Sequence, residues 1–250
     1  MMKKITILLA FLMLFATSVD AQRSKRSSKK SAPVSRSTTN SNKSNNDEAE
    51  ALFLLANKYI HGIGVPEDKD KAMDLLQQAA NMGYAKAKNE VEGMELCNTG
   101  EKYLDGNGVE QNWDRAIYLF RQAAEMDCVY GQFLMAIFYE EGLGTSLTKN
   151  HQESIAWFQK AAEQGDLFAQ RIMGSCYLTG DVVDVDYAKS VQWFKGPAEA
   201  GDPHSIYMLG AFHYAGKGVP EDKEKGAQLM RKAAELGDAD AKNMVESLGL

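Results

Sequence analysis

The sequence has few of the residues that build metal sites, disulfide frameworks or membrane spans. Among 250 residues there are 3 cysteines, 4 histidines and 5 prolines. The cysteines form no CxxC pair, and no two histidines have a ligand spacing such as HxxxH, so we expect no metal site. The longest apolar run, residues 5–16, is shorter than the ~20 residues that a bilayer span needs.

Motifs for nucleotide and acyl chemistry are also missing. The chain has no GxSxG nucleophile elbow and no P-loop, and its recurring GxG follows a predicted helix rather than a strand, which removes the phosphate-binding context. The carboxylates near each GxG lack the alternating spacing of a calcium loop. We therefore predict a protein that is not an enzyme, with no catalytic residue, no cofactor and no metal ligand.

The N-terminus has the pattern of an export signal. Residues 1–21 contain two lysines, then the apolar run, then the small residues Val19 and Ala21 before Gln22. We predict a cleaved signal peptide and a periplasmic or secreted protein that does not span a membrane after cleavage. An uncleaved anchor is the alternative, and the short apolar run disfavours it.

Residues 22–46 form a separate basic segment that is rich in serine and asparagine. It carries seven lysines and arginines and no acidic residue, and it has too few apolar residues to fold. We predict a disordered linker, which is either a solvated spacer or a tether to nucleic acid or an anionic envelope surface. The remaining chain has 19 basic and 33 acidic side chains, so we expect no nucleic acid as its partner.

An internal repeat begins after this linker. Four tyrosines and one histidine, each three residues before a glycine, recur at spacings of 44, 36, 38 and 36 residues. These residues are Tyr59, Tyr103, Tyr139, Tyr177 and His213, followed by Gly62, Gly106, Gly142, Gly180 and Gly216. We predict a repeat domain at 47–250, with units at about 47–83, 84–127, 128–165, 166–201 and 202–237 and a cap at 238–250.

Each unit has the pattern of two helices joined by a turn. In the second half of each unit, apolar residues recur at i, i+3, i+4 and i+7, which indicates one buried helical face. A short polar residue precedes each of these second helices as a predicted N-cap. The five N-caps are Asp68, Asn112, Asn150, Asp186 and Asp222. We expect these helices to stop near Gly83, Gly165, Gly201 and Gly237, with Asp166, Asp202 and Asp238 capping the next helix.

Some units depart from the pattern. The second unit has eight extra residues before Gly106, which predict either a first helix about two turns longer, with a bend near Gly93, or a small loop. Pro197 predicts a kink or stop near Lys195. Val182 occupies a position that is glycine in the other units.

The mid-helix glycines and the cysteines suggest close packing. Glycines inside the predicted first helices indicate close helix approach, with an alanine pair or a tryptophan over the missing side chain. These are Gly100, Gly174 and Gly210. For the cysteines, a Cys97–Cys128 disulfide is our preferred pairing, and three free buried thiols are the alternative.

The segments AQRIMGSCYLTG and GVPEDKEKGAQLMRKAAELGD resemble the Sel-one-like repeat family, a branch of the tetratricopeptide superfamily. The resemblance covers about 190 residues. It implies an all-α, right-handed α/α superhelix, a solenoid that binds other proteins, with no catalytic residue to carry over. The disulfide-rich secreted branch has two cysteines per repeat, and this chain does not share them.

These observations together predict a non-catalytic scaffold or adaptor that binds a protein or peptide on the concave face of the solenoid. The alternatives are a periplasmic regulatory subunit of a membrane sensor or polysaccharide-synthesis complex, and a cell-wall hydrolase accessory. Aromatic residues outside the packing positions are candidate partner contacts, although each could instead pack between units. They are Phe133, Phe138, Tyr207, Phe212 and Tyr214. The sequence does not indicate an oligomeric state.

Overall fold

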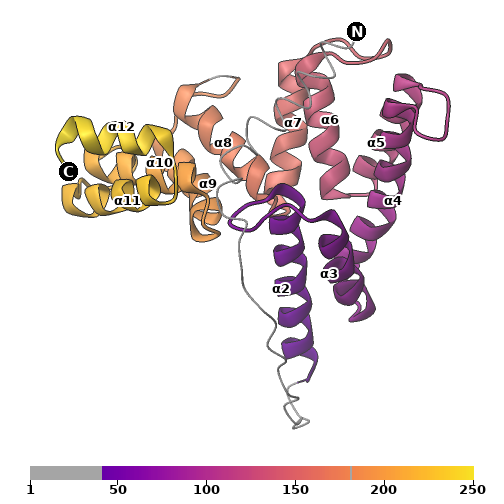
Figure 1. Cartoon of the computed structure of the whole chain (residues 1–250), viewed down its shortest axis with the longest axis horizontal. Coiled ribbons are helices and arrows are strands. Elements are labelled where there is room, and N and C mark those ends of the chain that lie inside the picture. Colours follow the sequence, from indigo (N-terminus) through magenta and orange to yellow (C-terminus); the bar gives the residue numbers. More distant parts are fainter. Residues whose placement is uncertain (1–40, 181) are drawn as a thin grey trace. The chain divides into compact units, whose positions relative to one another are not determined.

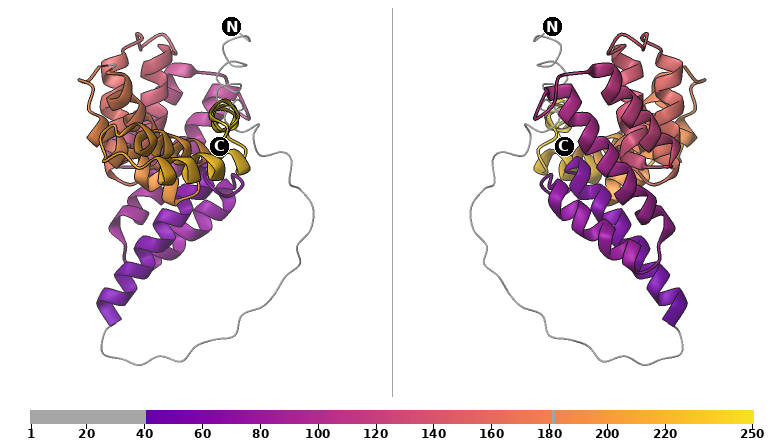
Figure 2. Two further views of the ribbon diagram at one scale, coloured as in Figure 1. Left: turned by 90° about the vertical axis from the view of Figure 1, so that its left-hand side faces the viewer. Right: turned by 90° about the vertical axis from the view of Figure 1, so that its right-hand side faces the viewer.

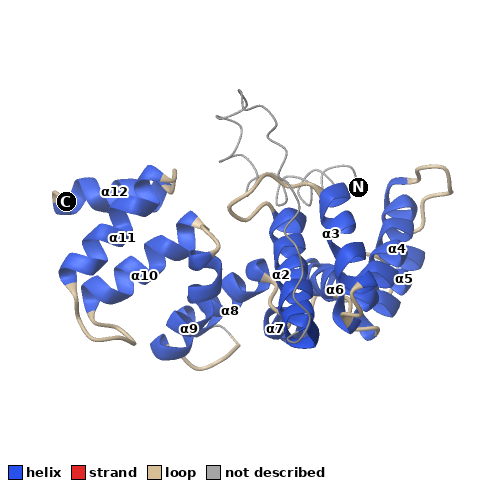
Figure 3. Cartoon of the chain, turned by 90° about the horizontal axis from the view of Figure 1, so that it is seen from below, coloured by secondary structure: helices blue, strands red, loops and turns tan. Residues whose placement is uncertain are grey.

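The computed structural model of the chain describes residues 41–180 and 182–250, and within these ranges it consists of α-helices and turns without a strand (Figures 1 and 3). The all-α prediction is therefore confirmed. The predicted signal peptide and most of the predicted linker lie outside the described residues. The helices are α2 (Ser41–His61), α3 (Lys69–Asn81), α4 (Ala85–Asp105), α5 (Trp113–Glu125), α6 (Val129–Glu141), α7 (His151–Glu163), α8 (Leu167–Thr179), α9 (Tyr187–Glu199), α10 (Pro203–Ala215), α11 (Lys223–Glu235) and α12 (Ala239–Leu248).

The region Asn45–Leu250 forms one compact body of stacked helices. From α3 to α12 each helix packs against the next one in the chain (Figures 1 and 2). In addition, α4 contacts α6, the first helix of the following unit, and α10 contacts the capping helix α12. This nearest-neighbour packing is that of a helical solenoid, as predicted. The right-handed sense of the superhelix stays a prediction. None of the helices in the described part is long and apolar enough to cross a membrane.

Local capping sets the boundaries of the second helices. Each predicted N-cap side chain accepts a hydrogen bond from the backbone N–H three residues later, which confirms all five. At the other end, four glycines take positive φ values from 89° to 103°. These are Gly83, Gly165, Gly201 and Gly237. In the second unit Asp127 takes this place with φ 62°.

The N-terminal boundary of the repeat region differs from the prediction. Helix α2 begins at Ser41, so residues 41–46 of the predicted linker are helical. The apolar residues Ala49 and Phe53, both 1% exposed, anchor the helix further along. Extending an existing helix costs far less than starting one, so polar residues can join it on the N-terminal side.

The eight extra residues of the second unit lengthen a helix and do not form a loop. Helix α4 has 21 residues, whereas α6, α8 and α10 have 13 each. Gly93 lies inside α4, and a Cβ at this position would overlap the side chain of Cys128. The two added turns thus bring α4 close to the start of α6.

Of the two outcomes predicted near Lys195, a kink or a stop, the stop is wrong. Helix α9 continues through Pro197 to Glu199. Pro197 lacks the N–H that would donate to the Trp193 carbonyl, so the helix loses one bond there, and it ends two residues later. Gly196 precedes the proline, and a residue without a Cβ relieves the clash that normally disfavours the helical conformation before proline.

The mid-helix glycines do mark close helix approach, but the predicted partners are wrong. A Cβ on Gly100 would lie 2.5 Å from the ring of Phe120, and one on Gly174 would lie 2.8 Å from the ring of Phe194. A Cβ on Gly210 would meet the Gly226 carbonyl oxygen at 3.0 Å. Phe120 and Phe194, rather than an alanine pair or a tryptophan, therefore cover Gly100 and Gly174.

Val182 is strained, which leads to a testable prediction. Its φ is 72°, close to that of its glycine counterparts such as Gly108 at 74°. A left-handed conformation costs a branched side chain about 1–2 kcal/mol. Glycine relieves this strain but also makes the unfolded chain more flexible, which offsets part of the gain. We therefore expect Val182→Gly to raise the free energy of unfolding, measured by urea denaturation, by about 1 kcal/mol.

Gly108→Val is the matched control for Val182→Gly. No atom lies within 4 Å of a Cβ built on Gly108, so this substitution tests the backbone conformation alone. We expect it to lower stability by about 1–2 kcal/mol. A neutral or destabilising Val182→Gly, together with a neutral Gly108→Val, would contradict the strain assignment.

Candidate functional site

Three of the five predicted partner-binding aromatic residues are buried. Phe133, Phe138 and Phe212 are 3%, 1% and 2% exposed. Phe138 packs on Phe120 with ring centroids 5.3 Å apart, and Phe212 packs on Phe194 at 6.3 Å. These three residues are corrected to packing residues, because the stacked helices enclose their rings and leave no surface for a partner.

Tyr207 and Tyr214 remain candidates for partner contact. Both are half-buried and lie on α10 seven residues apart, which places them on the same side of the helix two turns apart. Burial, followed by the nearby carboxylates Asp240 and Asp238, raises the pKa of Tyr207 above its ordinary value. Its hydroxyl therefore stays protonated and available as a hydrogen-bond donor.

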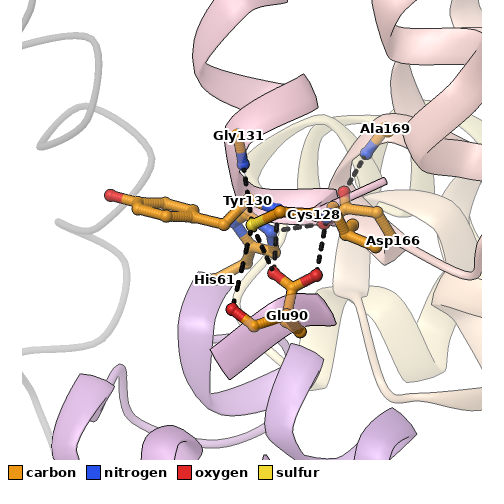
Figure 4. Close-up of polar contacts among 8 residues, drawn as sticks. His61, Glu90, Cys128, Tyr130, Gly131, Asp166 and Ala169 are labelled. Carbon is orange, nitrogen blue, oxygen red and sulfur yellow. Dashed lines mark hydrogen bonds and ion pairs between the residues drawn. The ribbon is translucent and has the colours of Figure 1, made fainter. Parts of the chain in front are cut away.

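A buried polar cluster, which the sequence did not reveal, joins distant units (Figure 4). We call His61, Glu90, Cys128 and Asp166 the inter-unit cluster. His61 Nε2 lies 2.5 Å from Asp166 Oδ2, and their side chains are 6% and 0% exposed. Asp166 also accepts a 2.6 Å hydrogen bond from the backbone N–H of Ala169, which caps α8. The end of α2 is thus tied to the start of α8.

Glu90 from α4 caps α6 in the same cluster. The N-cap of α6 is Cys128, where α8, α10 and α12 have aspartate. The backbone N–H groups of Val129 and Tyr130 donate to the Glu90 carboxylate at 2.6 and 2.9 Å, and the Cys128 thiol donates at 3.4 Å. The added turns of α4 therefore supply the carboxylate that α6 lacks.

The environment of Glu90 makes it a titrating group near neutral pH. Its side chain is completely buried, and burial raises its pKa to about 7, an effect that the two backbone N–H donors partly oppose. The charge of Asp166 raises the pKa further. A sequence signal existed in hindsight, namely a cysteine at the capping position and an acidic residue in the inserted turns.

The cluster resembles a cysteine nucleophile site in composition, but its properties do not suit catalysis. Burial, with smaller contributions from Cys97 and Glu90, raises the pKa of Cys128 well above its ordinary value. A nucleophilic cysteine needs the opposite shift and access to substrate. Cys97, Cys128 and Cys176 are buried and form no disulfide with one another, so the structure contains the second of the two predicted cysteine arrangements.

One group in the described region has the approximate geometry of metal ligands. Single ligand atoms of His204, Asp238 and Asp240 lie within 4.8 Å of one another. Asp238 already caps α12 and pairs with His204 at 3.6 Å. The positive end of the α12 dipole opposes a cation at this place. The group is explained by capping and ion pairing.

The comparisons with known proteins agree with the architecture. The Sel1 repeat family matches five consecutive segments, residues 49–84, 96–128, 129–166, 167–202 and 203–238. None of the curated proteins compared with the chain matches it. Solved structures that resemble it include c5321, a protective antigen present in uropathogenic Escherichia coli strains, with 33% sequence identity and a TM-score of 0.52.

A Sel1 repeat protein from Oxalobacter formigenes is also similar, with 27% identity and a TM-score of 0.57. In both comparisons 80% of this chain is covered, and the chain spans 40% of the c5321 structure and 66% of the Oxalobacter one. The family segments cover more than two thirds of the 250 residues and coincide with the observed helix pairs. This chain therefore belongs to the Sel1 repeat family.

Proposed function

We propose that this protein is an exported, non-catalytic scaffold that binds a protein or peptide along the face formed by its first helices. Sel1 repeat proteins are generally protein-interaction scaffolds. The observation that carries the proposal is that the residues that define the repeat have structural roles. The capping side chains hold helix ends, and the mid-helix glycines admit neighbouring rings or backbone, so the repeated residues stabilise the stack. The side chains between them can vary to suit a partner.

The best-supported contact region is the half-buried side of α10 that carries Tyr207 and Tyr214. Tyr207 and Tyr214 offer aromatic surface on one side of this helix, and tyrosine is enriched among residues that dominate binding energy. The surrounding body carries 33 acidic and 19 basic side chains. A partner with a basic surface would gain from this charge in association rate and in specificity.

Export is supported by the sequence of residues 1–21, which has the charged, apolar and small-residue regions of a signal peptide. The proposed site of action is therefore the periplasm or the cell exterior. Mass spectrometry of the mature protein from cell fractions tests this part. A mature N-terminus at Gln22 in an exported fraction is expected, and an intact N-terminus in the cytoplasm would contradict it.

The binding proposal predicts a selective loss of partner affinity. Full-length protein is used to capture its partner, and affinity is then measured for wild type, Tyr207→Ala, Tyr214→Ala and Tyr118→Ala. Tyr118 lies on the second helix α5 and is 49% exposed, which makes it the matched control. We expect the α10 variants to weaken binding by about 10-fold or more and the control to leave it unchanged. Equal binding by all four proteins would contradict this surface.

A further inference from the structure

A pair of positions in the repeat joins each first helix to the start of the next one. The first position lies six residues before the repeat tyrosine or histidine, and the second is the N-cap of the following first helix. Between units one and two, the rings of Phe53 and Tyr84 at these positions are 5.6 Å apart. Between units four and five, Arg171 pairs with Asp202 at 3.5 Å. The stacking of the units therefore brings the side chains at these two positions into contact.

Cys97 and Cys128 occupy the same two positions between units two and three. Cys97 lies six residues before Tyr103, and Cys128 is the N-cap of α6. Both cysteines are 0% exposed, and their side chains interact with each other. Two thiols thus meet where the neighbouring units have an aromatic contact or an ion pair.

Helix α4 approaches Cys128 closely. A Cβ on Gly93 would lie 2.2 Å from the Cys128 Cβ and 2.6 Å from its sulfur. Cys97 follows Gly93 by four residues, so it lies on the same face of α4, and its side chain tilts towards Gly93. The Glu90 carboxylate lies 3.4 Å from the Cys128 sulfur on the other side of Gly93 (Figure 4). This face of α4 therefore encloses the Cys128 side chain, as the short span of a disulfide requires.

We propose that Cys97 and Cys128 form a disulfide in the exported protein, which joins unit two covalently to unit three. The structure contains the dithiol form of this pair. Disulfides form and persist in the oxidising compartments outside the cytoplasm. This inference rests on the export part of the proposed function and names a covalent modification that the scaffold acquires there.

The bond forms by thiol–disulfide exchange with a disulfide oxidant such as oxidised glutathione. The thiolate of one cysteine attacks the oxidant and displaces one thiol, which leaves a mixed disulfide on the protein. The second cysteine attacks the protein sulfur of that mixed disulfide and displaces the other thiol. The protein loses two protons and two electrons, and the oxidant is reduced to two thiols.

We expect the exchange to take place while the chain folds. In the stacked protein both sulfurs are buried, and burial raises the pKa of Cys128 well above its ordinary value, so little thiolate is present to react. The same burial protects the disulfide from reducing agents after it has formed.

Oxidative refolding of the full-length protein is the first experiment. The reduced protein is unfolded in urea and diluted into buffer with oxidised glutathione, and the remaining thiols are blocked with N-ethylmaleimide. Trypsin places Cys97, Cys128 and Cys176 in separate peptides, residues 89–102, 122–149 and 172–189, which mass spectrometry identifies. We expect one disulfide between the first two peptides and a blocked thiol at Cys176. Three blocked thiols, or a disulfide that contains Cys176, would overturn the proposal.

Serine variants make the result specific. Serine is a good N-cap, so Cys128→Ser keeps the start of α6, and Cys97→Ser removes the other thiol. The disulfide closes a loop of 30 intervening residues, so we expect the refolded wild type to unfold at least about 5 °C higher before reduction than after it. Cys176→Ser is the matched control and should show the same shift, whereas the other two variants should show none. A shift that persists in Cys128→Ser would overturn the assignment.

Thiol trapping in the cells that make the protein tests the native state. We expect the disulfide in exported protein whose N-terminus is Gln22, and three thiols in a variant without residues 2–21. Exported protein with three thiols would overturn the disulfide and leave the export proposal intact. Wild-type protein that stays in the cytoplasm would contradict export instead, and oxidative refolding would still decide whether Cys97 and Cys128 pair.

Discussion

Glu90→Gln is expected to remove a pH dependence of stability that the wild-type protein shows between about pH 4.5 and pH 7. Burial raises the pKa of Glu90 from 4.5 to about 7 in the folded protein. Between these values the folded state holds a proton that the unfolded state has released. Stability from this group is therefore present at low pH and decreases as pH rises towards 7, by about 3 kcal/mol in total.

Urea unfolding at about pH 5 and pH 8 measures this effect. The difference between Glu90→Gln and wild type is the informative quantity, because the other titrating groups are common to both proteins. We expect the glutamine variant to gain stability relative to wild type as pH rises. Glu92→Gln, an exposed position on the same helix, should track wild type at both pH values. A constant difference between Glu90→Gln and wild type would contradict the buried, protonated state.

Gly131→Ala is expected to destabilise the protein by about 3 kcal/mol even though alanine favours helices over glycine. A Cβ on Gly131 would lie 2.7 Å from the backbone nitrogen of Ala124 and 2.8 Å from the Cβ of Ala123. Backbone atoms cannot move aside as the end of a flexible side chain can, so α5 and α6 would have to separate. The free-energy cost of this overpacking exceeds the free energy gained from the higher helix propensity of alanine.

Gly174→Ala is the matched comparison for Gly131→Ala. Gly174 lies inside α8, and the atoms nearest to its added Cβ belong to the Phe194 ring, the first of them at 2.8 Å. A ring can tilt, so we expect a loss of about 1–2 kcal/mol, clearly smaller than at Gly131. Chemical denaturation of both variants gives the comparison. A stabilising Gly131→Ala would show that the two helices are not in the close contact described.

The features that the sequence predicted correctly depend on residues close together in the chain. Asp68 caps α3 through an N–H three residues later, and Gly83 ends the same helix with a positive φ. Such interactions recur in each unit, so the repeat pattern reveals them before any tertiary contact is known. The lengthened α4 follows from the same reasoning, since an insertion of eight residues matches about two helical turns.

The features that the sequence did not predict depend on contacts between distant units. Glu90 and His61 look like ordinary surface residues in the sequence, and only the stacking brings them to Cys128 and Asp166. Phe133 was a candidate for partner contact because it lies outside the packing pattern of its own helix. Its burial results from α2 and α8, which contribute His61 and Phe168 to its surroundings.

Site-specific photo-cross-linking in the cells that make the protein tests the scaffold function most directly. A photoreactive phenylalanine analogue replaces Tyr207 on α10 or, as the control, the exposed Tyr118 on α5. We predict a discrete covalent adduct with a protein partner from position 207, none from position 118, and loss of the adduct when Tyr214→Ala is added. The same adducts from both positions, or none from position 207, would contradict partner binding on this face.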